Sequence, residues 1–341
     1  MLQESHTSSS SSFPIAYKPD ITMDSKANTT PYDLPDNAVW FITGCSSGIG
    51  RSLAELVLAH PTHRLVATAR SPAALSDLAG AAENADRLLK VALDVTSQAA
   101  IDAAVAAALA RFGRVDVLVN NAGYGIMGDA EAMAREEERR QVETNFWGPA
   151  ALCKHAVRVM RDENPKAAAG GKAGGVVLNV TSIGGFVGFP MHSLYHAAKF
   201  ALEGYTEGMA KEMLPDWNIH FCIIEPGGVN TGFAASVNRG GRHPAYERPD
   251  GPGRTLETMV ADPRAREMWA RPEAVARAMF KVVADAGSGA RGRIPIRLPL
   301  GVDAYAIIKR AVADVERDLE EFKELSISTQ KAAGDDMEAL A

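Results

Sequence analysis

The sequence predicts an α/β fold in three layers, with a doubly wound parallel sheet at its centre. Six short apolar runs rich in Val, Ile and Leu recur along the chain, at residues 39–43, 64–69, 89–93, 115–120, 175–181 and 220–225. Helical patterns separate these runs, notably at residues 48–59, 98–112, 135–161 and 193–214. Near-continuous apolar strands that alternate with helices are typical of a parallel sheet covered on both faces. We therefore expect a Rossmann fold with about seven parallel strands, and ligands beyond the carboxyl ends of those strands.

The composition narrows the kind of partner that the protein binds. Of the 341 residues, 46% are hydrophobic and 23% are charged, which is ordinary for a globular domain with a substantial core. The net charge of -6 argues against nucleic acid as a partner. No apolar run is long enough to span a bilayer, and the amino terminus lacks the apolar core of a secretory signal. We expect a small-molecule substrate and no integral membrane segment.

The cysteines indicate the compartment. Cys45, Cys153 and Cys222 are widely separated and lack metal-ligand spacing. They fit a reducing compartment, in which they would be buried as small apolar residues. We therefore expect a cytoplasmic protein without a metal site.

The chain divides into three parts. Residues 1–36 are rich in Ser, Thr, Asp and Pro without periodicity, which predicts a disordered or loosely ordered extension. Residues 37–300 form the single Rossmann domain, in which the Gly-, Pro- and Arg-rich stretch at about residues 232–271 is the candidate substrate loop. Residues 301–341 form a helical extension, with a charged amphipathic helix at residues 305–325. This helix could cover the active site or join an interface.

A glycine-rich turn follows the first strand. It reads Thr43-Gly44-Cys45-Ser46-Ser47-Gly48-Ile49-Gly50 and leads directly into a predicted helix. Glycines at such a turn let the backbone approach a pyrophosphate, and the helix offers free N–H groups and its positive dipole end. Between a strand and a helix, this pattern predicts a dinucleotide site. We expect cofactor contacts from Gly44, Ser46, Ser47, Gly48, Ile49 and Gly50.

The ends of the next strands bear on the choice of cofactor. An acidic residue after the second strand would bind the ribose 2′-hydroxyl, but Arg70 stands there and matches a 2′-phosphate. The sequence therefore predicts NADP(H) rather than NAD(H), with a solvated strand-end arginine as the alternative. Asp94 and Val95 follow the third strand, where the Asp94 carboxylate could bond the adenine or cap the next helix. Small residues after the fourth strand add Asn121, Ala122 and Gly123 to the expected cofactor contacts.

Tyr195 and Lys199 form the candidate acid/base pair. They lie four residues apart on a predicted helix and so share one face. A free phenol titrates near pH ~10, and a nearby ammonium favours the phenolate, so we expect Lys199 to lower the pKa of Tyr195. Lys199 could also bond the nicotinamide ribose. The alternative is a solvated Tyr–Lys pair on a helix surface.

Two further polar residues belong to this constellation. Ser182 follows the strand at residues 175–181 and so lies at a carboxyl end of the sheet, where its hydroxyl can stabilise a developing oxyanion. Asn145 lies inside a predicted helix near Gly148-Pro149 and could continue a proton path from Lys199 to solvent. Alone, each would be an ordinary strand-end serine or a poor helix former.

Taken in order and spacing, these residues resemble the classical short-chain dehydrogenase/reductase family across about residues 37–293. In that family an Asn, a Ser, a Tyr and a Lys form the active-site tetrad, which implies the same roles for Asn145, Ser182, Tyr195 and Lys199. The resemblance extends to Pro226-Gly227 followed by Thr231, and it implies cofactor contacts from Pro226, Gly227, Val229 and Thr231, besides Tyr195 and Lys199.

A closer likeness is to the hydroxysteroid and retinol dehydrogenase branch, through the glycine turn, Arg70 and the segment YHAAKFALEG at residues 195–204. It implies a bulky apolar substrate, which residues 185–191 could contact. We therefore expect an NADP(H)-dependent oxidoreductase that interconverts a ketone or aldehyde and an alcohol on a small to medium apolar substrate, steroid-, retinoid- or natural-product-like. An epimerase or dehydratase, or a non-catalytic NADP(H) sensor, are the alternatives. The resemblance also implies a homodimer or homotetramer.

Overall fold

The predicted sheet forms the centre of the computed structural model, which describes residues 28, 30–78, 86–167, 172–232, 238–286 and 293–329. Its seven strands follow the order β3-β2-β1-β4-β6-β7-β9, and every neighbouring pair is parallel. The strands are β1 (Val39–Ile42), β2 (Arg64–Ala69), β3 (Leu88–Ala92), β4 (Val117–Asn120), β6 (Gly175–Val180), β7 (Ile219–Pro226) and β9 (Arg297–Leu300). The expected Rossmann fold is confirmed, and among the strands of this central sheet β9 is the one that no predicted run covers.

The order of the strands creates a crevice next to β1. Phe41 of β1 pairs with Val66 of β2 on one side and with Leu118 of β4 on the other. From β1 the chain builds outward through β2 and β3, then returns to β4 and continues to β9 in the opposite direction. Such a reversal separates the carboxyl ends of the two central strands, which is where doubly wound sheets bind ligands.

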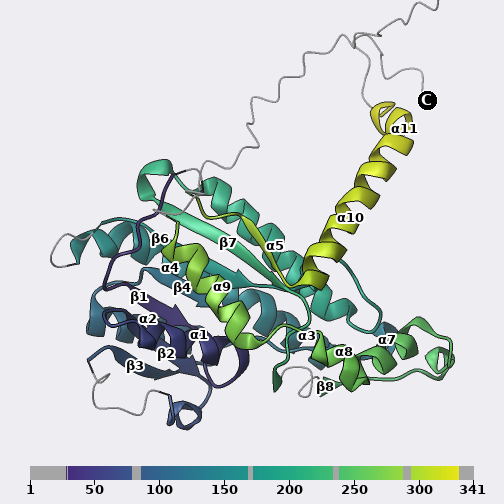
Figure 1. Cartoon of the computed structure of the whole chain (residues 1–341), viewed down its shortest axis with the longest axis horizontal. Coiled ribbons are helices and arrows are strands. Elements are labelled where there is room, and N and C mark those ends of the chain that lie inside the picture. Colours follow the sequence, from purple (N-terminus) through teal and green to yellow (C-terminus); the bar gives the residue numbers. More distant parts are fainter. Residues whose placement is uncertain are drawn as a thin grey trace, which may run out of the picture.

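Helices cover both faces of the sheet (Figure 1). One face packs against α1 (Gly48–Ala59) and α9 (Pro272–Ala284). The other packs against α2 (Gln98–Phe112), α4 (Gly148–Arg158) and α5 (Ser193–Glu212). Each strand therefore buries both faces, which explains its near-continuous apolar sequence.

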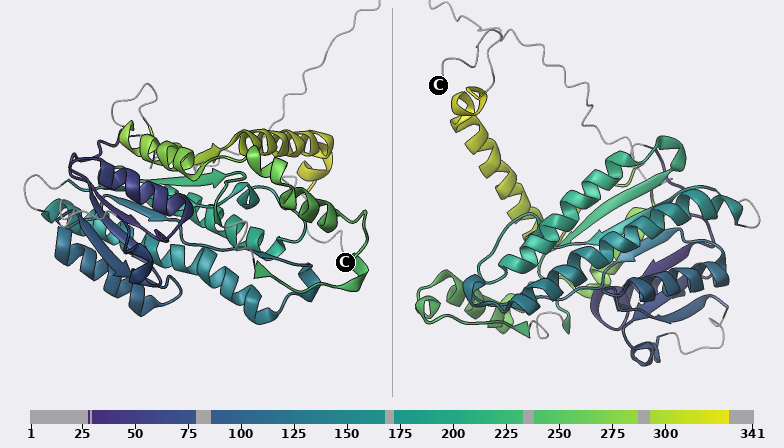
Figure 2. Two further views of the ribbon diagram at one scale, coloured as in Figure 1. Left: turned by 60° about the horizontal axis from the view of Figure 1, so that its bottom comes forward. Right: turned by 180° about the vertical axis from the view of Figure 1, so that it is seen from behind.

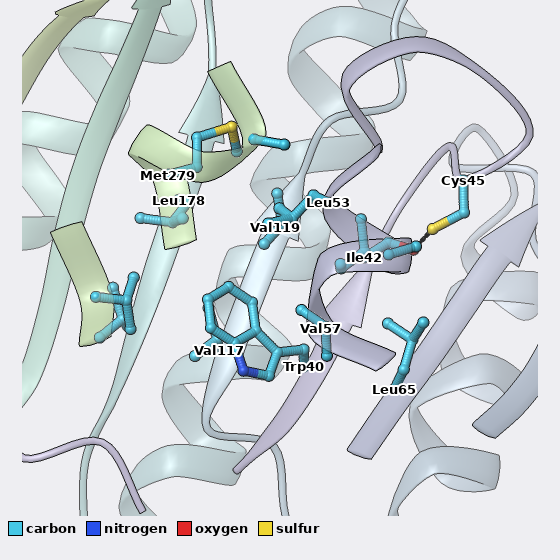
Figure 3. Packing of buried hydrophobic residues seen from close by; sticks show 14 of the residues in the cluster. Trp40, Ile42, Cys45, Leu53, Val57, Leu65, Val117, Val119, Leu178 and Met279 are labelled. Atoms are coloured by element: carbon cyan, nitrogen blue, oxygen red, sulfur yellow. Dashed lines mark hydrogen bonds between the residues drawn. The ribbon is translucent and has the colours of Figure 1, made fainter. Parts of the chain in front are cut away.

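Alternate residues of β1 enter the two separate core layers. Trp40 and Ile42 point toward α1, where Figure 3 shows them near Leu53 and Val57. The Trp40 ring stacks on the Phe280 ring of α9, with the ring centroids 5.4 Å apart. Burial of one such large apolar side chain stabilises the fold by about 1.5–3 kcal/mol. These contacts hold β1, and the turn that follows it, at a fixed place on the sheet.

The helical pattern at residues 135–161 forms one continuous helical run with two wider turns. It comprises α3 (Arg135–Val142), a π-helical turn (Glu143–Trp147), α4, and a second π-helical turn (Val159–Glu163). Such turns are frequent at functional sites because they change the direction in which a side chain points. The first of them carries Asn145.

The stretch expected to be a long irregular loop contains regular structure. It includes the short strand β8 (Asn238–Arg239) and the helices α7 (Pro252–Ala261) and α8 (Pro263–Glu267). β8 pairs in parallel with β5 (Ile126–Met127), which follows β4. Prolines at the first turns of α7 and α8 start these helices, which the high Gly and Pro content hid from the sequence analysis.

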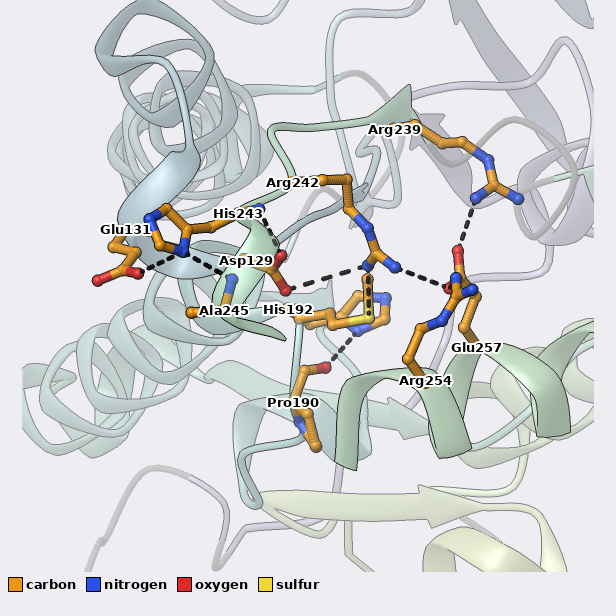
Figure 4. A network of polar contacts seen from close by, with 11 residues as sticks. Asp129, Glu131, Pro190, His192, Arg239, Arg242, His243, Ala245, Arg254 and Glu257 are labelled. Carbon is orange, nitrogen blue, oxygen red and sulfur yellow. Dashed lines mark hydrogen bonds and ion pairs between the residues drawn. The ribbon is translucent and has the colours of Figure 1, made fainter. Parts of the chain in front are cut away.

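An ion-pair network fastens this region (Figure 4). The Glu257 carboxylate on α7 accepts hydrogen bonds from Arg239 at 2.6 Å, Arg242 at 3.1 Å and Arg254 at 3.0 Å. The Arg242 guanidinium also lies 4.0 Å from the carboxylate of Asp129, beyond β5. The network therefore holds α7 and β8 against the segment that follows β4.

The end of the predicted amino-terminal extension packs against the domain. The Asn28 side chain donates to the Phe221 carbonyl at 2.6 Å and accepts from the Phe221 N–H at 3.2 Å. Tyr32 is also buried. Most of the predicted extension (1–36) falls outside the described residues, but packing begins before residue 36 because these side chains pair with β7.

The last helices leave the body of the protein. α10 (Val302–Glu321) starts beside β9 and projects outward, and α11 (Lys323–Ile327) lies at its far end (Figures 1 and 2). The amphipathic helix predicted at residues 305–325 thus corresponds to α10 and the start of α11, with a turn at Phe322 between them. Within the part of the chain that the structure describes, no helix is long and apolar enough to cross a membrane.

Candidate active site

A cavity of about 930 Å³ lies at the carboxyl ends of the strands. Nearly all residues predicted for the site line it, and only Gly50 and Asn145 of the predicted set do not. The predicted residues in the lining are Gly44, Ser46, Ser47, Gly48, Ile49, Arg70, Asp94, Val95, Asn121, Ala122, Gly123, Ser182, Tyr195, Lys199, Pro226, Gly227, Val229 and Thr231. The fold thus brings together residues that are up to 187 positions apart in the chain, from Gly44 to Thr231.

The glycine turn is braced against the end of β4. Gly44 adopts a left-handed conformation, with φ at 72°. The Asn121 side chain donates to the carbonyls of Thr43 at 2.9 Å and Gly44 at 3.2 Å. A Cβ atom at Gly50 would collide with the Gly44 carbonyl and the Asn121 amide, so Gly50 supports the turn from behind. The turn therefore requires glycine at both positions.

The start of α1 fits a phosphate group. Ser47 precedes the helix, and its side chain makes no capping hydrogen bond. The first N–H groups of α1 are therefore not satisfied by this side chain, and they lie at the positive end of the helix dipole. Ser46, Ser47 and Gly48 line the cavity at this end. The turn and the helix together could hold a pyrophosphate.

Arg70 and Asp94 stand at the next two strand ends. Arg70 is exposed, and its guanidinium makes no hydrogen bond with any residue that the structure describes. The Asp94 carboxylate accepts hydrogen bonds from the Thr96 N–H at 2.9 Å and hydroxyl at 2.7 Å, which lower the pKa of Asp94. Ser97, not Asp94, caps α2, because its hydroxyl accepts from the Ala100 N–H. Asp94 instead closes the turn before the helix.

Ser182, Tyr195 and Lys199 lie together in the lining of the cavity. The Ser182 hydroxyl oxygen accepts a hydrogen bond from the Gly184 N–H at 3.0 Å. The Tyr195 phenol is hydrogen-bonded to Ser182. The Lys199 ammonium lies 5.7 Å from the centroid of the Tyr195 ring and donates to the Val180 carbonyl at 2.8 Å. The predicted pair is therefore part of the cavity wall and not a solvated helix face.

Burial sets the proton affinities of this pair. It raises the pKa of Tyr195 to about 12, although the hydrogen bond from Ser182 acts in the opposite direction. It lowers the pKa of Lys199 to about 8, against the attraction of the Glu203 carboxylate. The pKa of Tyr195 is therefore raised and not lowered as the sequence analysis expected, because desolvation of the phenolate dominates. At neutral pH the phenol keeps its proton and is suited to donate it.

Asn145 lies behind the cavity wall. It is fully buried, and its side chain donates to the Tyr124 carbonyl at 2.8 Å and accepts from the Tyr124 N–H at 3.1 Å. A Cβ atom on Gly123 would lie 2.8 Å from the Asn145 Oδ1 and 3.6 Å from the Lys199 Nζ. Asn145 and Lys199 therefore border the same space beside Gly123, which any larger residue would fill, and Asn145 fixes the backbone that follows β4.

Known proteins share both the sequence pattern and the fold. A family model described as short chain dehydrogenase matches residues 38–241. The chain belongs to the short-chain dehydrogenase family. It is therefore an oxidoreductase that acts on CH–OH or C=O groups with a nicotinamide cofactor.

Several individual proteins are similar to this short-chain dehydrogenase. Oxidoreductase calM of Penicillium decumbens is 42% identical over 303 residues, which cover 88% of this chain and 95% of that protein. Retinol dehydrogenase 8 of Bos taurus is 33% identical over 271 residues, which cover 75% of this chain and 81% of that protein. A crystal structure of a short-chain dehydrogenase from Streptomyces avermitilis has a TM-score of 0.72 at 34% identity. The match covers 86% of this chain and 99% of that structure. The likeness to retinol dehydrogenases is thus confirmed.

The sequence analysis missed several residues of the cavity. Tyr124, Glu137, Arg140 and Thr144 also line the cavity of this short-chain dehydrogenase, from the end of β4 and from the helical run after it. Tyr124 follows Asn-Asn-Ala-Gly directly, and that position was a usable signal. Residues 185–191, all of which the structure describes, do not line this cavity.

A partly buried ionic cluster supports the site from β9. The Arg297 guanidinium contacts three carboxylates: Glu203, Glu207 at 2.8 Å and Glu225 at 2.6 Å. Glu203 lies one helical turn beyond Lys199, and Glu225 directly precedes the cavity residue Pro226. Burial and the Glu203 charge raise the pKa of Glu225 to about 7. The cluster ties α5 to the strand that leads into the site.

Proposed function

We propose that this short-chain dehydrogenase uses NADP(H) to interconvert a ketone or aldehyde and an alcohol on a small to medium apolar substrate. The observation that carries the proposal is the meeting of Ser182, Tyr195 and Lys199 in one cavity with the glycine turn. The protonated phenol of Tyr195 favours carbonyl reduction as the reaction in which it acts as an acid.

The side chains divide the work as follows. The Ser182 oxygen accepts from Gly184, so its hydroxyl hydrogen can point to a substrate oxygen beside Tyr195. Tyr195 donates its proton to that oxygen as negative charge develops. Lys199, held by the Val180 carbonyl, is charged at neutral pH and stabilises the phenolate that remains. A bound nicotinamide nucleotide supplies the hydride.

The Tyr195→Phe variant tests the acid role. It keeps the ring and loses only the proton, so we expect kcat to fall by about 10²- to 10⁴-fold with cofactor affinity retained. The assay follows consumption of NADPH with a panel of apolar ketones, aldehydes and alcohols. Turnover equal to that of the parent would refute the role, and a product formed without net NADPH consumption would favour an epimerase or dehydratase.

The preference for NADP(H) rests on Arg70. A charge-assisted hydrogen bond contributes about 1.5–3 kcal/mol, so we expect Arg70→Ser to lower the ratio of kcat/KM for NADPH over NADH by about 10- to 100-fold. Arg64→Ser is the matched control, because Arg64 stands at the opposite end of the same strand. An unchanged ratio in Arg70→Ser would contradict the assignment.

We also propose a cytoplasmic location. All three cysteines are free and buried, as expected for a protein of a reducing compartment. Cell fractionation tests this directly, and recovery of the enzyme with membranes or in a secreted fraction would contradict it.

A further inference from the structure

α10 carries an apolar stripe with the spacing of a coiled coil. Its members are alternately three and four residues apart, and we call them the α10 seam: Tyr305, Ile308, Val312, Val315, Leu319 and Phe322. α10 runs as one helix from Val302 to Glu321, so the first five members stay on one side of it, and Phe322 follows at the junction with α11. A strict repeat of this kind is the narrow seam by which one helix packs against another, not the broader face that a helix turns to a protein core.

The outer half of the α10 seam is uncovered. Ile308 is buried against the body of the protein, but Val315, Leu319 and Phe322 are 56%, 63% and 52% exposed. Figures 1 and 2 show that α10 projects away from the sheet, and along this half no described element other than α11 lies beside it. Contiguous exposed apolar residues of this kind mark an interaction surface.

The charges on this helix argue against a membrane as the occupant. Residues 302–327 contain seven acidic and four basic residues. Helices that lie on membranes are rich in Lys and Arg, because the membrane surface is negative. An acidic helix with a narrow seam fits another protein helix.

The residues that flank the α10 seam fit a second copy of the same helix. In a parallel pair in register, Asp318 near the end of α10 in one copy faces Lys323, the first residue of α11, in the other, and the two-fold axis repeats this contact. In an antiparallel pair centred on the exposed half, Glu316 would face Glu316 and Asp318 would face Asp318. Like charges at such positions destabilise a pair. Asp318 and Lys323 are exposed, and their present ion pairs, with Arg317 and Glu320, are weak surface contacts that can exchange.

We propose that the exposed half of the α10 seam pairs with the same helix of a second copy of the chain, as a parallel two-stranded coiled coil. The seam is short and buries less area than a standard interface, so the association is weak and depends on concentration. It adds to any contact that the copies make through other surfaces.

Cross-linking tests the orientation. Phe322→Cys places a thiol at the outer end of the seam, and the same residue of a second copy lies next to it only in the parallel pair. The native cysteines do not interfere because all three are buried. Arg317→Cys, on the opposite side of α10, is the control. We expect mild oxidation to give a covalent dimer with Phe322→Cys and little with Arg317→Cys; equal yields from the two variants would overturn the proposal.

Molar mass in solution tests the association itself. Leu319→Glu places a charge in the seam at an exposed position, so folding and NADPH-dependent activity should be retained. We expect the mean mass from light scattering to rise with concentration for the parent and to rise less for Leu319→Glu. Identical masses for both proteins at all concentrations would refute the pairing. Binding of the parent, but not of Leu319→Glu, to anionic phospholipid vesicles would show a membrane as the occupant and would refute it as well.

Discussion

Replacement of Glu225 by glutamine should change how stability depends on pH. Glu225 is fully buried at the end of β7, and one of its oxygens accepts from Arg297 at 2.6 Å. The other oxygen is buried without a hydrogen-bond partner among the described residues. Burial, together with the charge of Glu203, therefore raises the pKa of Glu225 to about 7. The folded protein holds this proton more tightly than the unfolded chain does.

The size of the effect follows from this difference in pKa. An ordinary glutamate titrates at 4.5, and Glu225 titrates at about 7 in the folded protein. Each pKa unit corresponds to about 1.4 kcal/mol, which gives about 3 kcal/mol in total. The folded pKa is raised, so this stability is fully present below pH 4.5 and is lost as the pH rises through 7. Glutamine cannot ionise and avoids the loss.

Urea denaturation of the parent and of Glu225→Gln at about pH 5 and about pH 8 measures the effect. We expect the free energy of unfolding of Glu225→Gln, relative to the parent, to rise by up to about 3 kcal/mol between these pH values. Three buried histidines, His63, His196 and His220, have pKa values lowered to about 4 by burial, so stability due to them is lost as the pH falls below 6.5. These histidines affect the stability of the parent and of Glu225→Gln alike, so their contribution cancels in the difference between the two free energies of unfolding.

Glu207→Gln is the matched control, because Glu207 also contacts Arg297 but is 36% exposed. The difference in free energy of unfolding between Glu207→Gln and the parent should change little between the two pH values. The reasoning about Glu225 is refuted if the difference in free energy of unfolding between Glu225→Gln and the parent is the same at both pH values.

Three further changes test other parts of the site. In Gly50→Ala the added Cβ collides with the Gly44 carbonyl, so we expect a lower melting temperature and at least a tenfold weaker affinity for NADPH by calorimetry; unchanged binding would contradict this. In Asp303→Ala the hydrogen bond from the Gly228 N–H, 2.7 Å long, is lost from the loop at the cavity. We expect KM for NADPH to rise several-fold at unchanged kcat, and a fall in kcat alone would refute this role. Ser182→Ala should lower kcat by about 10²- to 10³-fold with cofactor affinity retained, and full activity would exclude the oxyanion role.

The sheet and most of the cavity could be predicted because their signals are local. Each predicted strand is a continuous apolar run, and each strand end carries its site residues within a few positions. The sequence analysis did not predict β9, because this strand has four half-buried residues, including a proline. Its strand character depends on pairing with β7. The sequence analysis did not predict α7, because the proline and glycine at its start are typical of a loop.

Other features depend on contacts between distant residues. Arg297 and Glu203 are 94 positions apart, and no local pattern connects them. The protonated state of Tyr195 also depends on burial, which the spacing to Lys199 does not reveal. Asn145 was found by its family position, but its hydrogen bonds to Tyr124 result from a π-helical turn that the sequence does not signal.

Because Asn28 forms its hydrogen bonds with Phe221, the amino-terminal segment can dock only after the ribosome has synthesised residue 221. The two residues are 193 positions apart. A ribosome that adds about 5–20 residues per second needs about 10–40 s to make the chain between them. During that interval Asn28 and Tyr32 have emerged without their binding site, because β7 does not yet exist. Nascent chains shorter than about 220 residues therefore hold this segment undocked, where chaperones or proteases can reach it.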